Sequence, residues 1–117
     1  MSNYINIERA ILCTVLENEF ITANDYIREF ALVEEYFTTP FHKFLVRGIN
    51  RLKELNEPVD TDTLMVRFRD ANKWAISYDD ELLNVITTNS LGETLFKQYN
   101  ELLEKNYFES HRRGITI

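Results

Sequence analysis

Apolar side chains recur every three or four residues along most of the chain, the spacing that places them on one face of an α-helix. The clearest helix begins at Thr39 and Pro40, a cap followed by a first-turn proline. The Asn-Glu-Pro segment at 56–58 predicts its end, because proline restricts the residue before it and cannot continue the helix. We expect this central helix to organise the fold through an apolar stripe made of Phe41, Leu45, Gly48, Ile49, Leu52 and Leu55.

Two helices are predicted before the central one. The first starts near Asn6 and carries a wide apolar surface, which indicates packing on more than one neighbour. The segment 22–25 has the pattern of a capping box and predicts the start of a short second helix. The buried side of that second helix is expected to consist of Tyr26, Ile27, Phe30 and Ala31. The segment 32–37 then connects to the central helix, with about one helical turn of its own.

A fourth helix is predicted to start at Asp60 or Thr61, since both residue types cap helices well. Its buried side chains are expected to be Leu64, Met65 and Phe68. The segment 71–78 that follows has no regular pattern. Its Trp74 and Ile76 are expected to cover the core, and the alternative is an exposed anchor for a partner, because tryptophan is enriched at interfaces.

Two serine–acid pairs, Ser77 with Asp80 and Ser90 with Glu93, have capping-box spacing and predict the starts of the last two helices. The fifth helix is expected to bury Leu82, Leu83 and Ile86. The sixth is unbroken as far as Arg113, so it is about 35 Å long at 1.5 Å per residue. Part of it should therefore extend beyond the body of the domain.

The last helix has a broad apolar surface. One face carries Leu91, Leu95, Tyr99 and Leu102, and further apolar residues widen it. Because the projecting part of the helix needs a surface to cover it, we predict a partner or self-association surface that consists of Phe96, Tyr99, Leu103, Tyr107 and Phe108. The alternative, which the sequence leaves open, is that these side chains pack within the chain itself.

Composition narrows the fold to one all-α domain, a compact bundle of about six helices. Three glycines and two prolines in 117 residues leave little room for the turns of an all-β fold. The net charge of −6 argues against strong nucleic-acid binding, since phosphate affinity comes mainly from Lys and Arg. One cysteine excludes an internal disulfide. No signal peptide and no membrane-spanning run are recognisable, so the expected location is the cytoplasm.

Three residues stand out chemically. Gly48 in mid-helix costs about 1 kcal/mol relative to alanine, so we expect it to permit close approach of another helix. Cys13 is expected to be a small buried hydrophobe rather than a reactive thiol. His42 is expected to pack and hydrogen-bond locally, and the alternatives are a metal ligand or a general base. The sequence shows no phosphate-binding loop and no nucleophile–base set, so an enzyme is the least favoured class.

A resemblance covers most of the chain, from about Asn6 to Arg113. Phe37, Pro40, His42 and Phe44, then an apolar helix, then the Glu-Pro-Val-Asp segment at 57–60, follow a pattern similar to the N-terminal domain of the hexameric replicative DNA helicase of bacteria (DnaB type). That family reads roughly F-Y-x-P-x-H-x-x-I-F, an apolar helix, and G-x-P-I-D-x-x-T-L. The segment 7–12 resembles its opening helix.

The resemblance implies a globular helical subdomain at 1–90, and at 91–117 a long C-terminal helix that forms the first half of a helical hairpin and the start of a linker. In the family, hairpins pair between subunits into a collar on the hexamer, and the collar docks a DnaG-type primase within the primosome. A helicase loader is a further implied partner. ATP and Mg belong to a following RecA-like domain, so this chain is expected to bind no cofactor and to have no enzyme activity.

Two alternatives are kept open: the helicase-binding C-terminal domain of a DnaG-type primase, and a stand-alone helical adaptor. The Pro-His pair and the Pro-Val-Asp segment at 58–60 favour the helicase domain. Because the chain ends soon after Gly114, the second hairpin helix is expected to be missing. We therefore expect a monomer or a weak dimer in dilute solution, with any dimer an isologous contact through the last helix.

Overall fold

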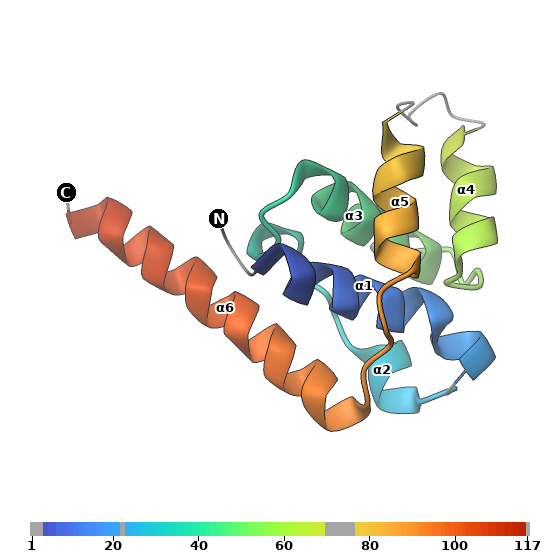
Figure 1. The fold of residues 1–117 in the computed structure, drawn as a ribbon, viewed down its shortest axis with the longest axis horizontal. Coiled ribbons are helices and arrows are strands. Elements are labelled where there is room, and N and C mark those ends of the chain that lie inside the picture. The colour runs from blue at the N-terminus through green and yellow to red at the C-terminus, as the bar shows by residue number, and fades with distance from the viewer. Residues whose placement is uncertain (1–3, 22, 70–76, 117) are drawn as a thin grey trace.

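The computed structural model describes residues 4–21, 23–69 and 77–116, and these ranges contain helices and no strand, which confirms the all-α prediction (Figure 1). None of the helices within these ranges is long and apolar enough to span a bilayer. Six α-helices and one 3₁₀ helix follow in the order α1 (Tyr4–Ile21), α2 (Asp25–Glu29), η1 (Glu34–Tyr36), α3 (Pro40–Glu54), α4 (Thr61–Arg69), α5 (Tyr78–Ile86) and α6 (Glu93–Thr116).

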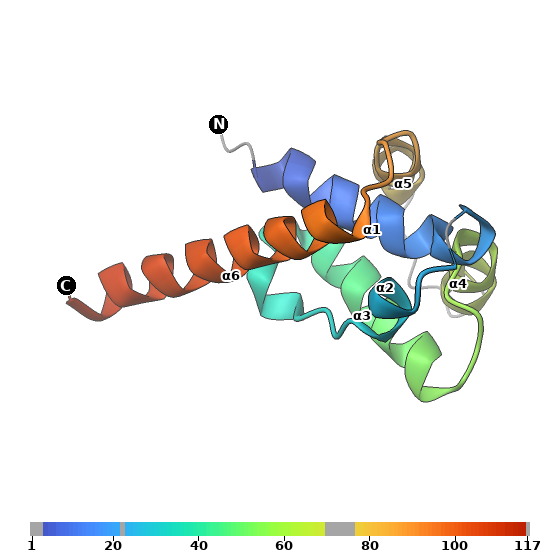
Figure 2. The same ribbon diagram turned by 90° about the horizontal axis from the view of Figure 1, so that it is seen from below.

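Helix α1 lies at the centre of the molecule, with contacts to α2, α3, α5 and α6. Figure 2 shows it between α5 on one side and α3 on the other. Half of its 18 residues are buried. The expectation of several neighbours for this helix is confirmed, and the expectation that α3 organises the fold holds in part, since α1 shares that role. A helix that is apolar around much of its circumference can be surrounded by neighbours, whereas α3 contacts α1, η1 and α4.

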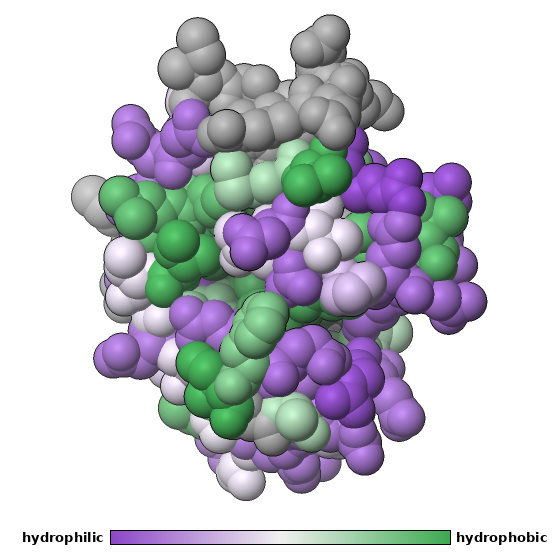
Figure 3. Space-filling view, turned by 90° about the vertical axis from the view of Figure 1, so that its right-hand side faces the viewer, coloured by the Kyte–Doolittle hydropathy of each residue, from purple (hydrophilic) through white to green (hydrophobic). Residues whose placement is uncertain are grey.

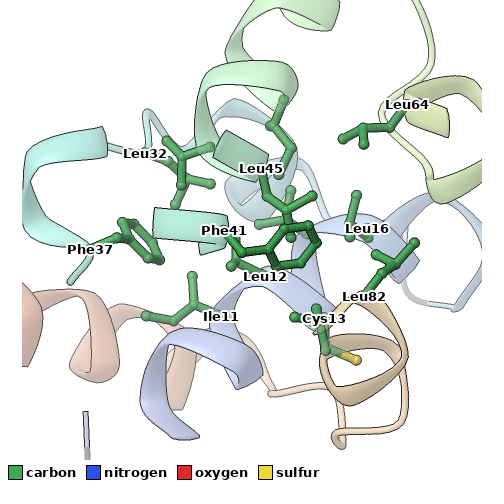
Figure 4. Close-up of a cluster of buried hydrophobic side chains, with 14 of the residues drawn as sticks. Ile11, Leu12, Cys13, Leu16, Leu32, Phe37, Phe41, Leu45, Leu64 and Leu82 are labelled. Carbon is green, nitrogen blue, oxygen red and sulfur yellow. The ribbon is translucent and has the colours of Figure 1, made fainter. Parts of the chain in front are cut away.

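The core lies between α1 and α3 and is closed by α5 and α6. Figure 4 shows Phe41 and Leu45 of α3 pointing toward Leu12 and Leu16 of α1, with Leu82 of α5 alongside. These five side chains are at most 5% exposed. Their packing at interior density makes α1 and α3 the structural unit on which the other helices rest.

Helix α3 has the predicted limits, although its start is capped differently from the prediction. It begins at Pro40, but the Thr39 side chain makes no capping hydrogen bond. The stripe is buried as predicted up to Leu52, while Leu55 is 41% exposed because it follows the last turn. The prediction for Gly48 is confirmed, since a Cβ there would lie 2.7 Å from Phe68 Cε2 of α4.

Two other helix starts are side-chain capped. Asn24 Oδ1 accepts a hydrogen bond from the Ile27 amide at 3.1 Å, and Asp60 Oδ1 accepts one from the Thr63 amide at 2.8 Å. The prediction of α4 from Asp60 is thereby confirmed. In α2 the predicted buried face holds only in part, because Ala31 follows the helix and is exposed.

The two predicted serine boxes are wrong. Ser77 makes no side-chain cap, and Ser90 Oγ instead donates to Glu17 Oε2 of α1 at 2.6 Å. On α5 the buried side chains are Leu82 and Val85, and Leu83 is 55% exposed. The predictions for Trp74 and Ile76, and for Thr22, fall outside the residues that the structure describes.

Candidate functional site

Helix α6 is the longest element, with 24 residues that span about 36 Å at 1.5 Å per residue. Figures 1 and 2 show its first half against the body and its C-terminal end projecting beyond it. The predicted projection is therefore present. Apolar residues on α6 form two stripes about 100° apart around the helix axis, which we call the inner and the outer stripe. The inner stripe contains Phe96, Leu103 and Tyr107, and the outer stripe contains Leu95, Tyr99 and Leu102.

The inner stripe packs on the chain's own core. Phe96 is fully buried and meets the rings of Tyr26 in α2 and of Phe30, the residue after α2, at centroid distances of 6.4 and 5.2 Å, both edge to face. Leu103, two turns further along, is 1% exposed. Edge-to-face aromatic pairs add about 0.5–1.5 kcal/mol beyond the area that they bury. The first half of α6 is therefore an integral part of the fold.

An aromatic cluster holds the second half of α6. The Tyr107 ring lies 5.1 Å from the ring of Tyr36 in η1, and the Phe108 ring lies 6.0 Å from the same Tyr36 ring. His111 stacks on Tyr107 at 4.0 Å, and its Nδ1 lies 3.0 Å from the Tyr107 carbonyl. The sequence analysis did not assign Tyr36 a role. Tyr36 lies in an acidic connector that has no periodic apolar pattern. The sequence therefore did not indicate that its ring contacts a residue some 70 positions later in the same chain.

The two leucines of the outer stripe are exposed, whereas Tyr99 is partly buried and packs against the core. Leu95 and Leu102, seven residues apart, are 40% and 41% exposed, and Tyr99 between them is half-buried. Phe108 at the projecting end is 49% exposed. A repeat of seven residues is the spacing with which one helix presents a seam to another. The outer stripe is therefore the face of α6 that a second helix could cover.

The five residues that were predicted to form the partner surface differ in how far the structure buries them. Phe96 and Leu103 lie in the core of this chain, so the expectation that they are available to a partner conflicts with their burial. Tyr99 and Tyr107 are half-buried, and Phe108 is exposed while also touching Tyr36. Their part in self-association stays a prediction. Leu95 and Leu102 were predicted to lie on the main apolar face of this helix, but not among the residues that contact a partner.

Exposure of apolar groups is not confined to α6. Phe20 and Ile21 at the end of α1 are 76% and 64% exposed. Figure 3 shows the side opposite the free end of α6, where apolar patches are interspersed with hydrophilic residues. The outer stripe differs because it has helical spacing on an element that already projects from the body.

A buried polar network joins α1 to the start of α3. Glu8 Oε1 accepts a hydrogen bond from His42 Nδ1 at 2.8 Å, and both side chains are at most 3% exposed. Glu8 Oε2 accepts from the Thr38 amide at 3.1 Å and from the Thr38 hydroxyl at 2.5 Å, and Oε1 accepts from the Thr39 amide at 3.4 Å. The Glu8 carboxylate therefore accepts from the amide of the N-cap residue Thr39 and from the amide before it, the role that the acid of a capping box has, while the Thr39 hydroxyl makes no cap.

The chemistry of this network is structural. Burial by itself would raise the pKa of Glu8, but the hydrogen bonds from His42 and Thr38 outweigh it and hold the pKa below the usual 4.5. The interpretation of His42 as a locally bonded histidine is confirmed. The sequence analysis missed Glu8, although an acidic residue one turn before Leu12, within the apolar surface of the first helix, was a readable signal.

Cys13 is buried, as predicted, and its Sγ donates to the Thr88 carbonyl at 2.7 Å. Burial, reinforced by the charge of Glu17, raises the pKa of the thiol to about 11. A thiol with this pKa is almost wholly protonated at neutral pH, and the thiolate is the reactive form. Within the described ranges, no three His, Cys, Asp or Glu side chains are grouped closely enough to hold a metal ion.

Comparison with known proteins adds one finding. A family model described as the DnaB-like helicase N-terminal domain matches residues 1–105, which is most of the 117-residue chain. No curated protein and no solved structure matches the chain. The matched region contains the central α1, the Glu8–His42 network and the first half of α6 with the outer stripe.

Proposed function

Because the chain belongs to the DnaB-like helicase N-terminal domain family, we propose that it is an assembly domain of a replicative DNA helicase and that it docks a DnaG-type primase. The family places the chain in DNA replication, in the part of a helicase that is not catalytic. The proposed role is to hold subunits together and to present a protein surface within the primosome, in the cytoplasm. A helicase loader is a further partner under this proposal.

The observation that carries the assembly role is the outer stripe of α6. Leu95 and Leu102 stay about 40% exposed on a helix whose other apolar stripe is already packed. Covering both leucines and Tyr99 with the same stripe of a second copy would remove apolar area from water at roughly 25 cal/mol per Å². A contact of this kind is isologous, since each copy contributes the same face.

The small size of this face limits its strength. Two half-exposed leucines and a half-buried tyrosine offer much less area than the roughly 800 Å² per partner of a standard stable interface. The proposal therefore includes only weak self-association of this chain in dilute solution. Strong nucleic-acid binding is not part of it, because the chain carries a net charge of −6.

Sedimentation equilibrium tests the assembly role. The variant Leu95→Glu/Leu102→Glu should weaken self-association at least about tenfold, since it places two charges in an apolar contact. Leu83→Glu is the matched control, because Leu83 is likewise an exposed leucine, at 55%, but lies on α5. Substitution of Leu103 is not a fair test, since glutamate at a buried position would unfold the domain.

A dimer that tolerates the double change on α6 but not the change on α5 would place the assembly surface elsewhere. Circular dichroism of each variant verifies that the helices are retained.

Primase docking rests on family membership, and it requires a separate experiment. The C-terminal domain of a DnaG-type primase, immobilised on a sensor, should bind the wild-type chain saturably. The single-stranded oligonucleotide used as a control should not bind at physiological salt, because the chain is acidic. Saturable binding of the oligonucleotide with no binding of the primase domain would refute the docking role.

A further inference from the structure

A groove of about 430 Å³ lies on the outer side of α3, between η1 and α4. Its apolar wall consists of Phe44 and Phe68, whose rings meet at 5.3 Å and 66°. Phe68 can lie this close to α3 because Gly48 has no side chain in its way. The groove shares no residue with the outer stripe of α6 and opens on a different part of the molecule.

The groove lies on α3, which is strongly basic although the chain as a whole is acidic. Helix α3 contains four basic residues and one acidic residue, which leaves nine basic and eighteen acidic residues in the rest of the chain. Three of the basic residues, Lys43, Arg47 and Arg51, are four residues apart, so they form a line along the helix beside the groove. At physiological salt, exposed charges interact strongly only within a Debye length of about 8 Å. These basic residues should therefore attract negatively charged groups that come this close to the groove.

The existing ion pairs leave part of this charge accessible. Arg47 donates through Nε and Nη2 to the Glu34 carboxylate at 3.0 and 2.7 Å, and Arg51 donates through Nη1 to Glu54 at 3.0 Å. The side chains of both arginines are more than 60% exposed. The Arg51–Glu54 pair is exposed at both partners and contributes little to stability, so a carboxylate from a partner can join or replace it at little cost.

We propose that this groove binds a short acidic peptide segment of another protein. An apolar side chain of the segment packs on Phe44 and Phe68, and its carboxylates lie beside Arg47 and Arg51. A nucleic acid strand fits less well, since Glu34 and Glu54 also line the groove and would repel a continuous row of phosphates. A peptide can place its few carboxylates next to the arginines and away from those two acids.

Fluorescence polarisation tests the proposal. The probe is a short fluorescein-labelled peptide with a central Leu-Phe pair flanked on both sides by aspartates and glutamates. Wild-type protein should bind it saturably, and the charge-inverted peptide, with lysine in place of each acid, should not bind. The variant Arg51→Glu should weaken binding about tenfold, since it turns a charge-assisted contact into a repulsive one.

Arg28→Glu is the matched control, because it makes the same change of charge at another exposed, ion-paired arginine that lies on α2 away from the groove. Equal weakening by both variants would show attraction to overall charge and would overturn the proposal. Failure of the wild type to bind the peptide would do the same. An unlabelled thymidine oligonucleotide that displaces the peptide at lower concentration than unlabelled peptide would assign the groove to nucleic acid instead.

Discussion

Helices α1 and α6 are both long, yet they relate to the rest of the molecule in opposite ways. Half of the residues of α1 are buried, including polar Glu8, Thr14 and Asn18. Of the side chains described on α6, only Phe96 and Leu103 are buried. α1 is surrounded by its own chain on most sides, whereas α6 is attached along one stripe and open along another.

This difference separates two uses of apolar residues. On α1 the fold buries them, except for Phe20 and Ile21 at its end, so a change at a buried position there should alter stability. On the outer stripe of α6 they are left over from the fold, so a change there should alter assembly and leave stability nearly unaffected. The four predictions below test this separation, and three of them compare a residue that the fold uses with one that it does not.

The largest effect is expected in the core. Leu12→Ala should destabilise the domain by about 2–5 kcal/mol, because Leu12 is fully buried and a cavity would remain. Leu102→Ala should cost less than about 1 kcal/mol, since Leu102 is 41% exposed. Urea unfolding followed by circular dichroism measures both. Equal losses for the two leucines would show that α6 belongs to the same cooperative core as α1.

Glu8→Gln is expected to cost about 1–3 kcal/mol at neutral pH, because the amide keeps the shape but loses the charge that holds His42 and the start of α3. The pKa of Glu8 is lowered on folding, so its contribution is present above pH 4.5 and is lost as the pH falls below that value. The stability difference between wild type and variant should therefore shrink in acid. Urea titrations at neutral pH and at about pH 3.5 test this, and a difference independent of pH would contradict it.

Tyr36→Ala should release the second half of α6. It removes the ring contacts with Tyr107 and Phe108, which contribute about 0.5–1.5 kcal/mol. Hydrogen exchange should accelerate for amides at 104–111 and remain unchanged in α1. Phe20→Ala is the control, because Phe20 is exposed at the end of α1. Tyr4, at the other end of α1, would not serve, since it packs on the core. Uniform acceleration along the chain would argue that η1 supports the whole fold.

The smallest effect concerns two helix caps. Asn24→Ala should cost about 1 kcal/mol, since the Asn24 side chain caps α2. Thr39→Ala should cost only a few tenths of a kcal/mol, because its hydroxyl makes no cap and Glu8 bonds the amide instead. Thermal unfolding of the two variants ranks them. A larger loss of stability for Thr39→Ala than for Asn24→Ala would show that the Thr39 side chain caps α3, as the sequence predicted.

Elements with signals inside their own segment were predictable. Pro40 and Pro58 bracket α3, and Asp60 caps α4, because these effects act over a few residues. Ser90 shows where such reasoning ends. Its hydroxyl had a plausible local partner three residues on, but donates to Glu17 some 70 residues earlier in the chain. A side chain that can bond in two ways takes the partner that the tertiary fold brings to it.

The sequence predicted the helix that carries the candidate surface, but not which face of that helix is exposed. Leu95 and Phe96 are both apolar and adjacent, so periodicity alone does not tell which stripe is packed and which is open. The choice is made by Tyr26 in α2 and by Phe30 just after it, because both rings pack on Phe96. The same limitation explains Leu83 on α5, which the pattern assigned to the core beside Leu82.

The hydrogen bonds of Glu8 at the start of α3 also predict which positions can vary among relatives of this chain. Position 8 serves a side chain, His42, and two backbone amides, those of Thr38 and Thr39. The histidine can be lost together with the glutamate, but the amides exist whatever residues occupy 38 and 39. An apolar pair at 8 and 42 would leave those amides without the acceptor that Glu8 supplies. Among relatives, position 8 should therefore keep an acceptor side chain even where position 42 is not histidine.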